Sequence, residues 1–318
     1  MQEKFPLISI CMPAYNAGRY IAEAIESLLN QTYSNWELII VNDGSVDDTL
    51  EKVEKYNSDN RIKVFSQENK GQCAAANKAY SHSKGAYIKF FDADDILSPK
   101  FLESQIQNIV GSDSKIASAK WGRFYGEDLN TFNFNQEPVW KTLPPIEWLN
   151  ISLGSLYPMM QCALFLIPRS ILNKSGLWNE KLSLINDFDF IIRVMLSSEE
   201  IVFSEDAILY YRSGIENSLS GQKSRKALES AFLSITLGLN SLQKNEDSRR
   251  VKKIMADTYK IWSYEFYPTA IDLYNSSIHN VNQNGGSDVR FPCGGFTKLL
   301  VYFLGWKLTK RIKLILGK

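Results

Sequence analysis

Hydrophobic and polar residues follow a regular order along the first hundred positions, where four short apolar runs have the character of buried strands. These runs cover residues 7–12, 36–41, 62–65 and 87–91. Between them apolar residues recur at helical spacing, and the predicted helices begin near residues 21, 48 and 72. Strands that alternate with helices form βαβ units, so the pattern predicts an α/β fold around a largely parallel sheet.

Beyond residue 95 the pattern is less regular, and we predict its elements one by one. Helices are expected over 99–110, 169–175 and 187–196, the second of them ending at Gly176. Extended segments are expected over 116–125, 161–167 and 207–211, and a polar, aromatic loop over 130–140. From residue 222 onward helical spacing dominates, and the Asn-Gln-Asn-Gly-Gly-Ser run at 282–287 resembles a linker.

These patterns divide the chain into three predicted parts. An α/β domain is expected over residues 1–220 and a helical extension over 221–281. The linker and a basic tail would fill residues 282–318.

A polar cluster follows each of the first four predicted strands. The clusters lie at residues 13–16, 42–45, 68–71 and 92–95. Because parallel strands end at one edge of their sheet, all four clusters are expected at that edge. Open α/β sheets bind ligands there, so the pattern predicts a binding site.

The last of these clusters, Asp92-Ala93-Asp94-Asp95, is the densest in carboxylates. Carboxylates so close together repel one another unless a cation lies among them. Mg²⁺ or Mn²⁺ is usually bound through one or two carboxylates together with substrate phosphates. The cluster therefore favours a cation that carries a diphosphate, although an acidic turn or helix cap before Pro99 would look the same.

Composition describes an ordinary globular protein of 318 residues, 44% hydrophobic and 22% charged. The four cysteines show no Cys-x-x-Cys spacing, which favours reduced thiols, a cytoplasmic location and no structural zinc. The first residues lack the apolar segment of a signal peptide, and no apolar run reaches the length of a membrane-spanning helix.

The charge of the chain is unevenly distributed. Six basic and no acidic residues occur from Lys298 onward, so with a net charge of +1 the preceding residues carry −5. This mildly acidic body argues against nucleic-acid binding. Taken as a helix, residues 306–316 have apolar residues on one side and basic residues largely on the other, with Leu314 as the exception. Such a helix suits an anionic membrane surface, and packing against the body is the alternative.

Several segments resemble family 2 glycosyltransferases. The specific matches are residues 8–16, 31–33, 37–45, 47–49, 69–71, 86–88 and 92–95, and the weaker ones are 176–180, 186–193 and 210–212. The resemblance implies a GT-A fold, in which a Rossmann-like, mostly parallel central sheet is flanked by helices. It also implies an inverting transfer of sugar from a nucleotide-sugar, and here the fold would carry a C-terminal helical extension.

The resemblance assigns roles to single residues. It places Ala14 and Asp43 in the nucleobase pocket, with Pro13 and Tyr15 shaping the first loop. It places Asp92 at the ribose and diphosphate, and Asp94 at the metal. It makes Asp187 the general base. The other positions that it assigns to donor binding are Asn69, Gly71, Ala93 and Arg212.

Alternatives stay open for three of these residues. Asp43 precedes Gly44 and is also suited to building a turn. Asp187 is also suited to capping its helix, which would leave Asp189 as the base. Arg212 is also suited to pairing with a surface carboxylate instead of facing the diphosphate.

The chain departs from the family pattern at three places. It has Asn186 where the family often has Glu, and Ala76 where many relatives have Arg. No histidine follows Arg212 closely, although some relatives bind metal with one there. At Asn186 the expected base keeps its place but loses an acidic neighbour, and the missing histidine predicts a metal site with few protein ligands.

Together, the pattern and the resemblance predict an inverting glycosyltransferase with Mn²⁺ or Mg²⁺ as cofactor. Asp43 is compatible with a pyrimidine, which favours a UDP-sugar donor. The expected acceptor is a saccharide or lipid-linked saccharide of bacterial surface polysaccharide, lipopolysaccharide or capsule synthesis, reached at the inner face of the cytoplasmic membrane. The alternatives are an inactive sugar-nucleotide-binding module and a sugar nucleotidyltransferase. The second would need a glycine-rich basic loop after the first strand, which this sequence lacks.

Overall fold

The computed structural model describes residues 5–155, 158–215, 221 and 223–316. Its larger sheet has the strand order β3-β2-β1-β4-β8. The strands are β1 (Ile8–Ala14), β2 (Trp36–Asp43), β3 (Ile62–Gln67), β4 (Tyr87–Phe90) and β8 (Ile167–Pro168). The first four run parallel and β8 runs antiparallel to β4, which confirms the largely parallel sheet.

The helices between these strands are α1 (Ile21–Leu29), α2 (Thr49–Glu54) and α3 (Gln72–His82). Buried apolar residues of α1 recur at positions 21, 24, 25 and 28, the spacing of one helix face. All eight residues of β2 are buried, because the sheet is covered on both sides. The alternating pattern of the first hundred residues therefore predicted this half of the fold correctly.

A second sheet has the strand order β5-β9-β6-β7. Its strands are β5 (Ile96–Leu97), β6 (Lys115–Tyr125), β7 (Asp128–Phe134) and β9 (Glu200–Ser213). Strands β6 and β9 pair in parallel, and the other pairs are antiparallel. The loop predicted over 130–140 is wrong for its first residues, which belong to β7. This edge strand is largely exposed, so it lacks the buried alternation that reveals a strand.

The strand predicted over 161–167 is also wrong. This segment is buried as expected, but it forms the 3₁₀ helix η1 (Cys162–Leu164) before the short strand β8. The carbonyl groups of Ala163 and Leu164 are satisfied by buried side chains instead of a strand partner. Lys89 Nζ donates to the Ala163 carbonyl at 2.6 Å, and Gln105 Nε2 donates to the Leu164 carbonyl at 2.8 Å.

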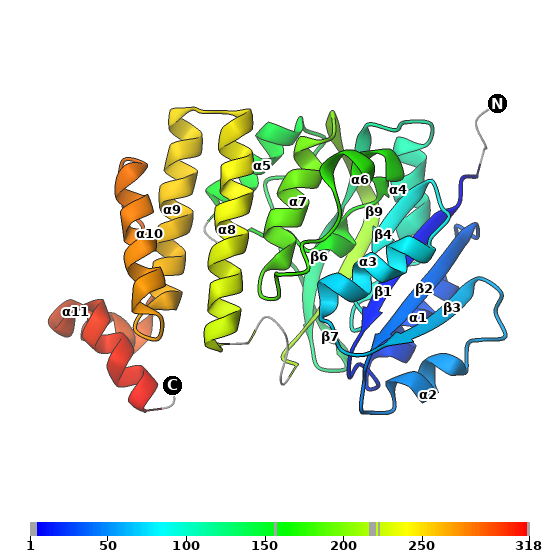
Figure 1. Ribbon diagram of the computed structural model, residues 1–318, viewed down its shortest axis with the longest axis horizontal. Helices are drawn as coiled ribbons and strands as arrows, with labels where there is room; N and C mark the ends of the chain where they lie inside the picture. The colour runs from blue at the N-terminus through cyan, green and yellow to red at the C-terminus, as the bar shows by residue number, and fades with distance from the viewer. Residues whose placement is uncertain (1–4, 156–157, 216–220, 222, 317–318) are drawn as a thin grey trace.

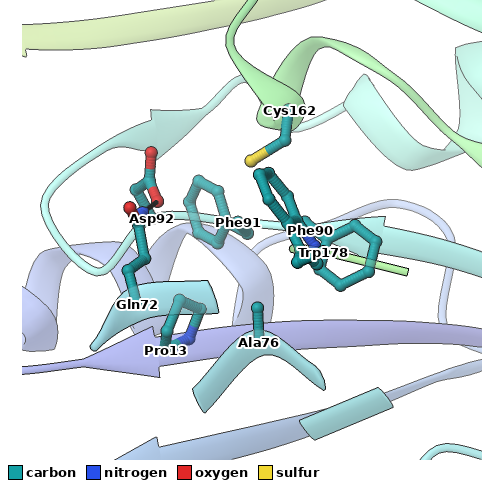
Figure 2. Close-up of a pocket in the computed structure, with 8 residues that line it drawn as sticks. All are labelled: Pro13, Gln72, Ala76, Phe90, Phe91, Asp92, Cys162 and Trp178. Atoms are coloured by element: carbon teal, nitrogen blue, oxygen red, sulfur yellow. Dashed lines mark hydrogen bonds between the residues drawn. The ribbon is translucent and has the colours of Figure 1, made fainter. Parts of the chain in front are cut away.

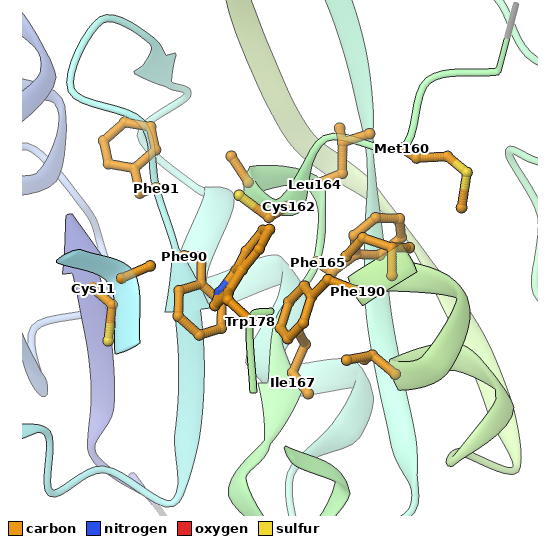
Figure 3. Packing of buried hydrophobic residues seen from close by; sticks show 14 of the residues in the cluster. Cys11, Phe90, Phe91, Met160, Cys162, Leu164, Phe165, Ile167, Trp178 and Phe190 are labelled. Atoms are coloured by element: carbon orange, nitrogen blue, oxygen red, sulfur yellow. The ribbon is translucent and has the colours of Figure 1, made fainter. Parts of the chain in front are cut away.

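Four further helices are α4 (Phe101–Ile109), α5 (Pro145–Gly154), α6 (Arg169–Ser175) and α7 (Asn186–Leu196). Three of them were predicted, and α5 was not. Aromatic packing fixes α7 over the end of β4 (Figure 3). Trp178 and Phe190 stack with ring centroids 3.9 Å apart, and each meets Phe90 edge-on at 5.4 Å. This contact sets the position of the first turn of α7.

The C-terminal third is helical, as predicted. It comprises α8 (Arg225–Asn245), α9 (Arg249–Phe266), α10 (Ile271–Gln283) and α11 (Gly295–Ile315). Helices α8, α9 and α10 stand side by side next to α7, and α11 lies at the outer end (Figure 1). One hydrophobic core runs from β1 to α10 without a break. The division at residues 220 and 281 therefore stays a prediction.

Helix α11 begins earlier than the predicted segment and contains a kink at Gly305, whose φ is 72°. After the kink, the Trp306 ring packs against Tyr264, Tyr267 and Phe291 with centroids 4.9 to 5.6 Å apart. The second half of α11 is thus partly packed on the body, as the alternative interpretation required. Within the described residues, no helix is both long and apolar enough to cross a bilayer.

Close packing of α8 against α7 depends on Gly238. A Cβ atom there would lie 2.8 Å from Phe188 Cδ1 and 3.0 Å from Ile192 Cδ1. We expect Gly238→Leu to lower the free energy of unfolding by about 1 to 3 kcal/mol, because the helices must move apart. Gly154→Ala is the control, since nothing lies within 4 Å of its Cβ position. Urea unfolding of both variants measures the difference, and an unchanged Gly238→Leu would contradict this packing.

Candidate functional site

The carboxyl ends of β1, β2, β3 and β4 lie next to one another. Ala14 pairs with Asn42, Asp43 pairs with Gln67, and the Phe91 amide donates to the Cys11 carbonyl at 3.0 Å. The four predicted polar clusters therefore meet at one edge of the sheet. A small pocket opens there (Figure 2), lined by Pro13, Gln72, Ala76, Phe90, Phe91, Asp92, Cys162 and Trp178.

Asp43 is buried at the end of β2 and closes the loop that leads into α3. Its Oδ1 accepts hydrogen bonds from Gln67 Nε2 at 2.7 Å and from the Lys70 amide at 2.9 Å. Its Oδ2 accepts one from the Gly71 amide at 2.8 Å. The structure thus brings Asp43, Asn69 and Gly71 together. Asp43 does build a turn, and Oδ2 keeps room for one more donor, since a carboxylate has about four acceptor sites.

The first loop is tied to the loop after β2. The Asn16 amide donates to Ser45 Oγ, and Asn16 Oδ1 accepts from the Val46 amide, both at 2.9 Å. Pro13 and Ala14 lie at the end of β1, whereas the Tyr15 side chain is 52% exposed. An exposed ring at the edge of the site is free to contact a ligand.

Amide side chains surround the acidic cluster after β4. Gln72 Nε2 donates to Asp92 Oδ1 at 3.0 Å, and Gln161 Nε2 donates to Asp92 Oδ2 at 2.9 Å. Gln161 also donates to Asp95 Oδ2, while Asp95 Oδ1 accepts from the Arg212 amide at 2.9 Å. Sequence reasoning missed both glutamines, because an isolated glutamine in a helix or an apolar run has no periodic signal.

Burial and mutual repulsion raise the pKa values of these carboxyls. Burial, together with the Asp92 charge, raises the pKa of Asp94 to about 7. Burial is also the main cause that raises the pKa of Asp92 and of Asp95, and the charges of Asp94 and Asp92 add to it for Asp95. A cation bound beside these carboxylates would lower their mutual repulsion and favour their ionised forms.

The ligand type of this cluster therefore suits a divalent cation, although the protein supplies few ligands. Hard carboxylate oxygens are the ligands that Mg²⁺ and Mn²⁺ prefer. Over the part of the chain that the structure describes, no group of three or more His, Cys, Asp or Glu residues is arranged to hold a metal. A cation here would be held by Asp94 and completed by ligands from a substrate.

Asp187 lies in the first turn of α7, close enough to the acidic cluster to feel its charge. The Cys162 amide donates to its Oδ1 at 3.1 Å. Burial and then the Asp92 charge raise the pKa of Asp187 to about 8. The helix has no side-chain cap, so Asp187 does not cap it. Asp189 is paired with Arg193 at 2.9 Å, which leaves Asp187 as the carboxylate that faces the site.

Asn186, which stands where the family often has Glu, joins α7 to the acidic cluster. Its Nδ2 donates to Gln72 Oε1 at 3.0 Å, and Gln72 in turn donates to Asp92. Its Oδ1 accepts from the Asp187 amide at 2.9 Å. A neutral amide at this position links Asp187 to Asp92 without adding another charge.

Arg212 is placed differently from the expectation that it faces the diphosphate. Its guanidinium donates to the carbonyls of Asp94 and Gly126 and to Glu23 Oε2. The rings of Tyr20 and Phe124 lie 4.6 and 4.5 Å from the guanidinium carbon, and the side chain is fully buried. These contacts favour the alternative, in which Arg212 pairs with a carboxylate. They make it a residue that positions Asp94.

Comparisons with known proteins identify the family of this chain. A model of the family described as Glycosyl transferase family 2 matches residues 9–176. Glycosyltransferase GlyG of Streptococcus pneumoniae is 35% identical over 217 residues, covering 65% of this chain and 70% of that protein. Chondroitin synthase of Pasteurella multocida is 45% identical over 101 residues, which are 31% of this chain and 10% of that protein. An uncharacterized glycosyltransferase of Rickettsia felis is 30% identical over 90% of this chain, which spans about half of that relative.

Solved structures resemble this chain in fold. TarS 1-349 of S. aureus in complex with UDP-GlcNAc superposes with a TM-score of 0.62 at 20% identity, covering 90% of this chain and 94% of that one. A mannosyltransferase from Pyrobaculum calidifontis in complex with GDP-Man and Mn²⁺ gives 0.59 at 12% identity, covering 99% and 89%. These likenesses confirm the predicted fold class.

The raised pKa of Asp187 leads to a stability prediction. A carboxyl whose folded pKa exceeds its unfolded pKa of 3.8 keeps its proton to a higher pH in the folded state than in the unfolded state. The free energy of unfolding therefore falls as pH rises from 3.8 toward 8, and Asp187 ionises as the pH passes through about 8. In EDTA at pH 8, we expect Asp187→Asn to be more stable than the wild type by roughly 1 to 3 kcal/mol. The gain should vanish near pH 4.

Urea unfolding at the two pH values measures this difference. Asp189→Asn is the matched control, because it breaks the ion pair with Arg193 and should destabilise the protein at pH 8. Equal destabilisation by both substitutions at pH 8 would contradict the described environment of Asp187.

Proposed function

We propose that this chain, which belongs to glycosyl transferase family 2, moves a sugar with inversion from a nucleotide diphosphate sugar to the hydroxyl of an acceptor. The main support is that Asp187 and the acidic cluster meet at the carboxyl edge of the sheet. Asp92 and Asp187 lie 95 positions apart in sequence, yet the charge of one raises the pKa of the other. The site thus offers one carboxylate, Asp187, to act as a base and a separate acidic cluster to bind the metal and the donor.

Asp187 is the proposed general base. The acceptor oxygen forms a bond to the anomeric carbon of the donor sugar while the bond from that carbon to the diphosphate oxygen breaks. The proton of the acceptor hydroxyl passes to the Asp187 carboxylate, which must be ionised to take it. Inverting glycosidases use a carboxylate base opposite the leaving group in the same way.

Asp94 is the proposed metal ligand, and Asp92 faces the ribose and diphosphate together with Ala93. A bound Mn²⁺ or Mg²⁺ supplies positive charge against the charge that develops on the departing diphosphate. Arg212 holds the backbone of Asp94, because it donates to the Asp94 carbonyl at 2.7 Å. Fixing this backbone keeps the Asp94 carboxylate at the diphosphate end of the site.

The proposed donor is a UDP-sugar. Asp43 Oδ2 has an acceptor site left for the N–H of a uracil ring, and Asn69 and Gly71 shape the loop around it. Pro13, Ala14 and Tyr15 form the facing loop. The TarS neighbour is described in complex with UDP-GlcNAc and with UDP, which supports this choice of nucleotide.

The proposed acceptor is a saccharide or a lipid-linked saccharide of bacterial surface polysaccharide. The support comes from relatives named chondroitin synthase and hyaluronan synthase, each 45% identical over 101 residues. A soluble saccharide and a membrane-bound one both fit a site at an open sheet edge.

Calorimetric titration tests the donor site. We expect UDP to bind more tightly than GDP, dTDP or CMP, and its affinity to fall at least tenfold, roughly 1.4 kcal/mol, without Mn²⁺ or in Asp94→Asn. Asp113→Asn, an exposed carboxylate elsewhere, should behave as the wild type. UDP binding that ignores Mn²⁺ would remove the role of Asp94. No binding of any nucleotide would contradict the function and favour another class of protein.

We also propose that α11 attaches the protein to the inner face of the cytoplasmic membrane. Phe296, Tyr302 and Phe303 are 73%, 81% and 76% exposed. The helix carries five basic residues and no acidic one: Lys298, Lys307, Lys310, Arg311 and Lys313. Lys310 donates to the Tyr264 carbonyl of α9, which leaves the other four for lipid headgroups. Exposed aromatic rings beside basic side chains suit anionic lipid headgroups. The exposed apolar surface begins earlier in the chain than the predicted 306–316 segment.

Vesicle flotation tests this attachment. We expect binding to vesicles that contain about one third phosphatidylglycerol, and no binding to neutral ones, because the basic residues need anionic lipid. Replacing Phe296, Tyr302 and Phe303 together with Ser should weaken binding at least about tenfold. Ile271→Ser, an exposed apolar residue of α10, is the control. Full binding by the triple variant would rule out α11 as the anchor.

A further inference from the structure

The guanidinium of Arg123 lies close to two aromatic rings on the second sheet. Arg123 of β6 pairs with Tyr211 of β9 in the strand register. Its guanidinium carbon is 5.4 Å from the centroid of the Tyr211 ring and 5.4 Å from that of the Trp121 ring. The two rings meet edge-on at 6.2 Å. We call these three side chains the Arg123 patch.

The Arg123 patch borders the carboxylates of the site. Tyr211 directly precedes Arg212, whose amide donates to Asp95 Oδ1 at 2.9 Å. Successive side chains of a strand point to opposite faces. Arg212 packs between Tyr20 and Phe124, so Tyr211 belongs to the other face. Burial is the main cause that raises the pKa of Tyr211, and the charges of Asp95, Asp92 and Asp94 add to it, which agrees with its closeness to them.

Arg123 has hydrogen-bond capacity left for a ligand. Its side chain is exposed, and the hydrogen bond from its Nη1 to Ser213 Oγ is long at 3.4 Å. Within the described residues, no carboxylate lies at ion-pair distance from it. Arg212, by contrast, has its guanidinium occupied by Glu23 and two carbonyls.

The aromatic part of the patch is rigid. Trp121 is 4% exposed, and its Nε1 donates to Glu137 Oε1 at 2.9 Å. Burial raises the pKa of Glu137, so that carboxyl belongs to the packed layer under the patch. A guanidinium that rests on fixed rings keeps its planar fork in one orientation, and such a fork matches carboxylate and phosphate oxygens in pairs.

We propose that the Arg123 patch binds an anionic group of the acceptor, a carboxylate on a sugar or a phosphate of a lipid-linked saccharide, beside the reacting hydroxyl. The inference rests on the proposed function and adds the charge of the acceptor to it. The partly buried Tyr211 offers the accessible part of its ring to the sugar, with the buried Trp121 packed edge-on against it. Arg123 supplies two parallel hydrogen bonds to the oxyanion. The Arg123 patch thereby selects acceptors that carry a negative charge.

Binding of small probes tests the patch with the donor site filled. The protein is saturated with UDP and Mn²⁺, and three probes are titrated by ligand-observed NMR: methyl glucuronide, methyl glucoside and farnesyl diphosphate. We expect one anionic probe to bind at least about tenfold more tightly than the neutral glucoside. Methyl glucuronide as the tighter probe indicates a uronic acid acceptor, and farnesyl diphosphate indicates a lipid diphosphate.

Variants connect this preference to Arg123. Arg123→Gln should abolish it, and Arg123→Lys should retain part of it, because lysine keeps the charge without the fork. Arg61→Gln is the matched control, since Arg61 lies 3.9 Å from the Trp36 ring beside another strand of the larger sheet. It should keep the full preference.

Two results would overturn the inference. One is equal binding of charged and neutral probes to the wild type, and the other is an undiminished preference in Arg123→Gln. UDP affinity is measured on every variant and should be unchanged in Arg123→Gln. A wild type that fails to bind UDP would contradict the proposed function instead, and the glucuronide and glucoside pair would then still decide the patch.

Discussion

Mutual repulsion among buried carboxylates is the constraint on which the arrangement of the site depends. Asp92, Asp95 and Asp187 are brought together where several parallel strands end, and burial makes each charge costly. Most of the side chains that hydrogen-bond within this cluster are neutral amides. Gln72, Gln161 and Asn186 supply donors without cancelling the negative charge. These hydrogen bonds organise the carboxylates, and the proposed cation would relieve the repulsion that remains.

A second layer of buried polar groups holds these amides in place. Lys89, in the middle of β4, is fully buried and donates to the Ala163 carbonyl, with the Phe101 ring 4.1 Å away. Burial lowers the pKa of Lys89 well below its ordinary value, because the apolar surroundings favour the neutral amine. Gln105 donates to the Leu164 carbonyl of the same turn. Together they fix η1, and η1 presents Gln161 and the Cys162 amide to the carboxylates.

The parts of the fold that follow from local pattern could be predicted, and those set by distant partners could not. The strand-helix alternation placed Asp43 and Asp92 at one sheet edge, and the family resemblance pointed to Asp187. Nothing local indicates that residues 162–164 form a 3₁₀ helix, because Lys89 and Gln105 impose it from other elements. The direction of Arg212 likewise depends on Glu23, which lies 189 positions away.

The contact between α7 and α8 has a practical consequence for anyone who wants a smaller catalytic fragment. A chain ended at residue 220 would keep every residue assigned to the donor, the metal and the base. It would also lose the helix that covers Phe188 and Ile192, the two side chains that meet α8 at Gly238. Phe188 and Ile192 belong to α7, the helix that also carries Asp187. The apolar face exposed by the truncation would promote aggregation, and α7 would lose the packing that holds it in place. Expression of an active fragment therefore requires α8 and the helices packed on it.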